Sequence, residues 1–174
     1  LTGFWWLILL VLFLAYGLFG MYVRSDSGAV RWDYTKLGMP IVGNLLRKVY
    51  VLRFIALIGI LVDSGLSIID SLRITGNSIA NKVYRLKVQE VINSVKDGGK
   101  ISDSLRDSEY LFPAEIIEMI AVGEASASVA KVCEKVADQY QREIDNSLKK
   151  LTSVFEPVMI LVVGLFVALL ALAI

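Results

Sequence analysis

The clearest helical pattern in the chain lies in residues 126–155, which read SASVAKVCEKVADQYQREIDNSLKKLTSVF. Apolar side chains recur there every three or four residues, which places them on one face of an α-helix, and the other face is charged. The apolar positions are Val129, Val132, Cys133, Val136, Tyr140, Ile144, Leu148, Leu151 and Phe155. The pattern predicts an amphipathic helix from Ser126 to Lys150, roughly 37 Å long at 1.5 Å per residue.

The two ends of the chain differ from this amphipathic part. Residues 1–23 and 157–174 contain no charged side chain, whereas all 18 lysines and arginines and 16 of the 17 acids lie within residues 24–150. Each end is about long enough to cross a hydrocarbon core of about 30 Å as a helix. We therefore predict transmembrane helices over 1–23 and 154–174. A signal peptide is the alternative for the first segment, but its basic start is absent.

Basic residues flank both predicted spans on the side of the middle segment. Arg24 and Arg31 follow the first span, and Lys149 and Lys150 precede the last. By the positive-inside rule, the middle segment is then cytoplasmic. The single cysteine, Cys133, agrees with a reducing compartment.

The middle segment is predicted to be all-α, because no sustained strand alternation occurs. Residues 24–50 are interpreted as a cytoplasmic linker and the start of the first helix, with a turn at SDSG (25–28) and a break at GMP (38–40). Residues 51–153 are predicted to form a helical bundle. Gly65 is expected to end its first helix in the left-handed conformation, and Pro113 to begin the fourth. The second and third helices are predicted over 67–74 and 77–95, and residues 102–106 form at most a turn.

Several classes of function are excluded by composition. The net charge of +1 offers no basic face for nucleic acid, and the absence of histidine removes the commonest general base and zinc ligand. The segment GGKIS at 98–102 lacks the first glycine of a phosphate-binding loop, and no strand precedes it. We predict a protein without enzymatic activity, cofactor, metal or nucleic-acid partner.

Two acidic residues stand out by their position. Glu124 lies among small residues where two predicted helices meet, and it is either a contact or hinge residue or, as the spacing favours, a cap of the next helix. Glu156 precedes Pro157 at the mouth of the predicted last span, where a functional and a structural role are equally open. Cys133 lies on the apolar helix face and is interpreted as a core residue, not a nucleophile.

Short motifs occur in a fixed order along the chain. They are WD at 32–33, PIVG at 40–43, LVDSGLSIIDSL at 61–72, GGKISDSL at 98–105, FP at 112–113, MIAVGE at 119–124 and FEP at 155–157. Together with the flanking apolar segments, their order and spacing resemble the second half of the type II secretion system F domain proteins. Ala127 departs from the pattern, since the family usually has glycine at that position.

The resemblance implies a cytoplasmic bundle of about six helices with a non-catalytic role in the bacterial inner membrane. Such proteins form the platform of type IV pilus and type II secretion machines. The implied partners are a cytoplasmic assembly or secretion ATPase, other platform subunits, pilin or pseudopilin, the membrane and further copies of the chain. Our candidate interaction or packing residues are Gly65, Pro113, Gly123, Glu124, Glu156 and Pro157.

Two alternatives belong to other classes of protein. A piece of a transporter or channel would need polar side chains along its spans. Residues 1–23 offer only Thr2, Tyr16 and Tyr22, and residues 158–174 offer none. A membrane-bound enzyme would need an acid–base pair in a pocket, and the sequence does not suggest one.

Overall fold

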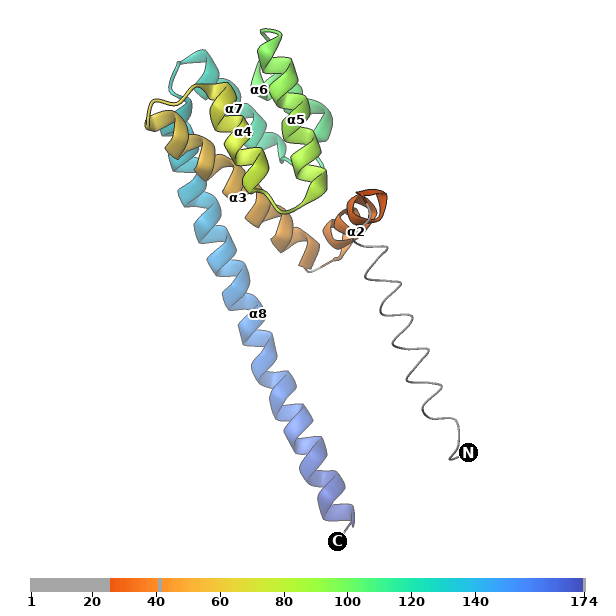
Figure 1. The fold of residues 1–174 in the computed structure, drawn as a ribbon. Helices are drawn as coiled ribbons and strands as arrows, with labels where there is room; N and C mark the ends of the chain where they lie inside the picture. Colours follow the sequence, from red (N-terminus) through yellow and green to blue (C-terminus); the bar gives the residue numbers. More distant parts are fainter. Residues whose placement is uncertain (1–25, 41, 174) are drawn as a thin grey trace.

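The computed structural model describes residues 26–40 and 42–173, and every regular element in them is a helix (Figure 1). This confirms the predicted all-α class. The elements are α2 (Asp26–Gly38), α3 (Val42–Asp63), α4 (Ile68–Ser78), α5 (Lys82–Lys96), α6 (Ile101–Leu105), the 3-10 helix η1 (Arg106–Ser108), α7 (Ala114–Ala125) and α8 (Val129–Ala173).

The core of the bundle forms where α3 packs along α8. Helix α7 covers α8, and the α4–α5 pair packs on α3 through α4, while α2 contacts α3 and α5. An aromatic cluster joins three of these segments: the Phe112 ring centroid lies 4.9 Å from that of Phe54 and 5.3 Å from that of Tyr84, both edge to face. All three side chains are fully buried, so this contact ties the loop before α7 to α3 and α5.

Helix α2 overturns the predicted turn at SDSG, because the helix already begins at Asp26. Its tertiary contacts explain the difference. Leu37 is fully buried, and the Asp33 carboxylate accepts a 2.8 Å hydrogen bond from the Lys82 backbone amide at the start of α5. The predicted break at residues 38–40 is confirmed, since α2 ends at Gly38 and α3 begins at Val42.

The boundary between the second and third predicted helices is also wrong. Helix α4 continues to Ser78, and Gly76 within its last turn lies against α5: a Cβ at that position would be 3.0 Å from Val88 Cγ1. Helix α5 starts only at Lys82, after Asn81, whose side-chain oxygen accepts hydrogen bonds from the amides of Val83 and Tyr84. This is an N-cap, which sets the start of the helix more strongly than apolar spacing does.

Helix α8 is a single helix of 45 residues that continues through Pro157 (Figure 1). Its N-terminal part packs on α3 and α7, and Ile144 is the last of its side chains that the structure describes as buried. Beyond the bundle, large apolar side chains such as Ile160 and Leu161 are mostly exposed.

The structure describes only one of the two predicted membrane spans. The first, at 1–23, lies outside the described residues. For the second, at 154–174, none of the described helices has the length and apolar character needed to cross a membrane.

Candidate functional site

The junction of α6, α7 and α8 contains an acid, Glu124, whose carboxylate accepts three hydrogen bonds. The Glu124 carboxylate accepts bonds from the Ile101 amide (2.6 Å), the Ser102 amide (3.2 Å) and the Ser102 hydroxyl (2.5 Å). Lys100, at the N-cap of α6, makes no side-chain capping bond, so Glu124 supplies that cap from α7. Glu124 is therefore a capping residue. The helix that it caps is α6, whereas the sequence spacing favours capping of the helix that follows Glu124 in the chain.

Gly123 allows α7 to approach α8 closely. A Cβ at Gly123 would lie 3.1 Å from Val129 Cα and 3.3 Å from Val132 Cβ. The turn that follows contains Ala127 with φ of 50°, in the left-handed region that favours glycine. Glycine would adopt this conformation without strain, so the alanine strains the α7–α8 turn.

The other candidate residues lie elsewhere on the chain. Gly65 follows α3 with φ of 86°, which confirms the predicted left-handed helix end. Pro113 is the N-cap of α7, at the opposite end of that helix from Gly123 and Glu124. Pro157 is exposed on the projecting part of α8. The backbone of Glu156 is helical, and its side chain lies outside the described ones.

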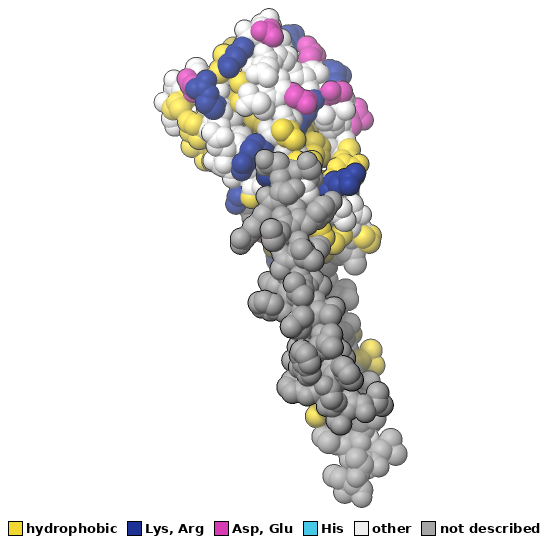
Figure 2. All heavy atoms as spheres, turned by 45° about the vertical axis from the view of Figure 1, so that its right-hand side comes forward, with side chains coloured by type: hydrophobic (Ala, Val, Ile, Leu, Met, Phe, Trp, Pro, Cys, Tyr) yellow, Lys and Arg dark blue, Asp and Glu magenta, His cyan; other side chains and the backbone are white. Residues whose placement is uncertain are grey.

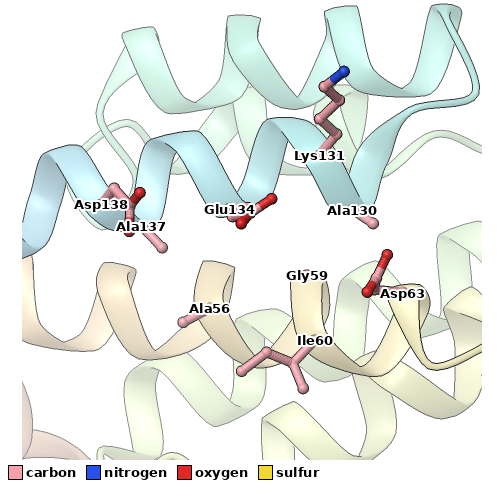
Figure 3. Close-up of a pocket in the computed structure, with 9 residues that line it drawn as sticks. All are labelled: Ala56, Gly59, Ile60, Asp63, Ala130, Lys131, Glu134, Ala137 and Asp138. Carbon is pink, nitrogen blue, oxygen red and sulfur yellow. The ribbon is translucent and has the colours of Figure 1, made fainter.

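A groove of about 560 Å³ runs between α3 and α8 (Figure 3). Its floor is made of small residues, which let the two helices approach: a Cβ at Gly59 would lie 3.0 Å from Cys133 Cβ. The lining residues are Ala56, Gly59, Ile60 and Asp63 on α3, and Ala130, Lys131, Glu134, Ala137 and Asp138 on α8.

The charged residues that line the groove are mainly acidic: Asp63, Glu134 and Asp138 against Lys131. Figure 3 shows the Lys131 side chain pointing away from α3. Ile60 is 63% exposed beside them. A partner segment with basic side chains and an apolar contact residue would complement this surface in charge. We did not predict this groove from the sequence, although the small residues at 56 and 59 and at 130 and 137 are a readable signal on each helix.

The cysteine and the charged surface of the described residues give little support for a reactive site. Cys133 lies under the groove and is 2% exposed, and burial raises the pKa of its thiol to about 11. A buried thiol of this kind is protonated at neutral pH and does not act as a nucleophile, which supports its interpretation as a core residue. The face of the bundle in Figure 2 carries both basic and acidic side chains, together with apolar patches, so it presents no surface of one charge sign.

Comparison with known proteins gives matches over most of the chain. The family model described as type II secretion system (T2SS), protein F, matches residues 54–174. A type IV pilus assembly protein PilC from Thermus thermophilus is 32% identical over 163 residues, 94% of this chain and 39% of the relative. A PilC from Myxococcus xanthus is 33% identical over 141 residues, 81% of this chain and 34% of the relative.

A relative from the secretion branch matches as well. A type II secretion system protein F from Pseudomonas aeruginosa is 30% identical over 152 residues, 87% of this chain and 37% of the relative. The chain therefore spans less than half the length of the curated relatives it matches.

Proposed function

Because the chain belongs to the type II secretion system protein F family, we propose that it is part of an inner-membrane platform on which a type IV pilus or a type II secretion machine is assembled. In this role it is not an enzyme. It couples a cytoplasmic assembly or secretion ATPase to the addition of pilin or pseudopilin subunits, in an assembly with other platform subunits and further copies of itself.

In the proposed arrangement, residues 24–153 lie in the cytoplasm and residues 1–23 and 154–174 lie in the membrane. The support is the distribution of charge: the lysines and arginines all fall between the two uncharged ends. The localisation proposed for the protein is accordingly the bacterial inner membrane, with the bundle on the cytoplasmic side.

The observation that carries the coupling role is the continuity of α8. The same 45-residue helix packs on α3 and α7 in the bundle and then projects from it. Although α8 contains Pro157, no loop interrupts it, and a helix transmits a displacement along its length that a flexible loop would absorb. We infer that movement of the bundle by the ATPase reaches the membrane through α8, and that Glu156 and Pro157 shape the segment where α8 meets the membrane.

Two surfaces have distinct proposed roles in this mechanism. The Glu124 and Gly123 junction holds α6, α7 and α8 together, so that the bundle moves as a unit. The groove between α3 and α8 is the proposed contact surface for the ATPase or another platform subunit, because its lining is mainly acidic and Ile60 beside it is exposed.

The coupling role is tested by interrupting α8 just after the bundle. Asn146 is exposed two residues beyond Ile144, the last α8 side chain described as buried, and Asn146→Pro would remove a backbone hydrogen bond and kink the helix, at a cost of about 3 kcal/mol. We expect Asn146→Pro in the full-length protein to abolish pilus or secretion output while the protein still accumulates in the membrane. The matched control Asn146→Ala should retain output. Normal output in Asn146→Pro would contradict the coupling role.

The proposed orientation is tested separately, by labelling. Lys131 is exposed, so Lys131→Cys in a Cys133→Ala background provides one reactive thiol on the bundle. A membrane-impermeant maleimide should label it only after the inner membrane is opened. Labelling in intact spheroplasts would place the bundle on the outer side and refute the orientation.

A further inference from the structure

A second cavity, of about 100 Å³, lies where α3, residues 109–113 and α8 meet. Its α8 residue is Tyr140, one turn before Ile144, the last α8 side chain described as buried. The cavity is therefore at the end of the bundle from which α8 projects. A volume of this size holds one tetrahedral oxyanion or about three water molecules, and it is too small for a nucleotide.

The cavity contains a cation whose hydrogen bonding is incomplete. Arg47 lines it, and the Arg47 Nε atom is buried without a hydrogen-bond partner. The guanidinium carbon lies 4.7 Å from the centroid of the Tyr110 ring, a cation–π contact that orients the group. An Nε atom that water cannot reach is out of reach of a ligand as well, so the donors left for an oxyanion are the two Nη groups, which make no hydrogen bond with any described residue.

None of the carboxylates around Arg47 forms an ion pair with it among the described residues. Glu143 is bound by Lys48 at 2.6 Å, and Glu115 accepts from the Tyr140 hydroxyl at 3.3 Å. Glu109 lines the cavity, but no ion pair joins it to Arg47 among the described residues. The site thus has one unpaired guanidinium, and Lys48 retains donors beyond the one used by Glu143.

We propose that this cavity binds a single phosphate group, with Arg47 as the principal donor and Lys48 and Asn44 as flanking donors. The planar guanidinium fork matches the oxygens of a phosphate and binds them more selectively than an ammonium group does. The group comes either from a phospholipid headgroup or from free phosphate. The phospholipid source rests on the proposed function, because only the proposed membrane orientation turns this end of the bundle towards the membrane. Binding of free phosphate does not depend on the proposed function.

The experiment has one arm for each source. In the first, the full chain in a sugar-headgroup detergent is titrated with inorganic phosphate by calorimetry, against chloride at matched ionic strength. In the second, the chain is placed in phosphatidylcholine vesicles with or without phosphatidic acid, and hydrogen exchange is followed at residues 109–113. Binding in the first arm supports a phosphate site, and protection only with phosphatidic acid identifies the headgroup as the source.

Variants of one helix make the test specific. Arg47→Gln should weaken binding at least about tenfold, the loss expected for a charge-assisted hydrogen bond. Arg47→Lys, which keeps the charge without the fork, should weaken it less. Arg53→Gln is the matched control, because Arg53 is exposed on α3 outside this cavity, and its binding should equal the wild type.

Two results would overturn the proposal: no response of the wild type in either arm, or unchanged binding by Arg47→Gln. If Arg47→Gln fails to fold, the wild type and Arg47→Lys decide the question. Pilus or secretion output is not part of the readout, so a negative result here leaves the proposed function standing.

Discussion

The Glu124 carboxylate and the Ile101 amide, 23 residues apart in sequence, are joined by a hydrogen bond of 2.6 Å. This bond and the two from Ser102 attach the short helix α6 to the C-terminal end of α7. Since α6 has only five residues, it depends on such contacts for its stability.

Replacing Glu124 by alanine should therefore destabilise the bundle. Three donors lose their acceptor, and the Ser102 side chain is buried, so we expect a loss of about 1–3 kcal/mol in the free energy of unfolding. Urea denaturation followed by circular dichroism measures it. Glu134→Gln is the control, because Glu134 is exposed and should change stability by less than about 0.5 kcal/mol. Equal stability of Glu124→Ala and wild type would show that the cap is dispensable.

Replacing Ala127 by glycine should stabilise the protein. The φ of 50° at Ala127 strains a residue with a Cβ by about 1–2 kcal/mol, and the greater freedom of glycine in the unfolded chain offsets part of the gain. We expect a net increase of about 0.5–1 kcal/mol, measured as a higher melting temperature. Ala125→Gly, at the helical end of α7, should have the opposite sign. A lower melting temperature for Ala127→Gly would mean that the turn is not strained.

Replacing Gly123 by alanine should separate α7 from α8. The added Cβ would meet backbone, Val129 Cα at 3.1 Å, which cannot rotate away as a side chain can. We expect a loss of about 1–3 kcal/mol, the usual range for overpacking. Gly38→Ala provides the comparison, since a Cβ there meets no atom within 4 Å. If both substitutions have the same effect on denaturant unfolding, close packing at Gly123 is not limiting.

Acid should weaken the contact between α5 and η1. Lys87 binds Asp107 at 2.6 Å and Glu90 at 3.0 Å, and the bond from Lys87 holds the pKa of Asp107 below its ordinary value of 3.8. Because this pKa is lower in the folded state, the stabilisation is complete above pH 3.8 and is lost as pH falls through the folded-state pKa.

Asp107→Asn removes this titration, so its stability should fall less steeply in acid than that of the wild type. Denaturant unfolding measured from neutral pH into the acid range gives the two slopes. Lys87→Met should flatten the slope in the same way, because it removes the partner that lowers the pKa of Asp107. Parallel curves for all three proteins would rule out this linkage.

The Cys133 thiol should react slowly in the folded protein. Burial raises the pKa of this thiol to about 11, so the thiolate fraction at neutral pH is very small and the sulfur is shielded by α3. We expect a thiol reagent such as DTNB to react fully in denaturant and only slowly without it. Rapid reaction of the native protein would indicate that α8 separates readily from α3.

Periodicity was sufficient to predict the helices that pack through one continuous apolar face. The helix predicted from Ser126 is an example, because the stripe from Val129 to Ile144 is the surface that α8 buries. Its start is wrong by three residues: α8 begins at Val129, since Ala127 in the preceding turn has a φ of 50°. Helix α2 was missed because its stability comes from tertiary contacts, notably the bond from the Lys82 amide to Asp33, which no local pattern contains.

The candidate sites likewise depend on tertiary contacts that no local sequence pattern contains. The sequence predicts that Glu124 caps a helix, since an acid beside small residues at a helix junction favours this, but it does not indicate which helix. The identity of α6 as the capped helix depends on a contact between residues 101 and 124 that only the folded chain brings together. The α3–α8 groove likewise requires that Gly59 and Cys133 face each other, which neither helix's own sequence specifies.

The length of α8 beyond the bundle gives it mechanical leverage. From Ile144 to Ala173 the helix extends about 44 Å at 1.5 Å per residue, so a tilt of about 10° at the α3 contact would swing its far end by about 8 Å. That sweep exceeds the 5.4 Å pitch of an α-helix. A repacking of a few side chains around Gly59 and Gly123 would thus be amplified into a stroke longer than one helical turn.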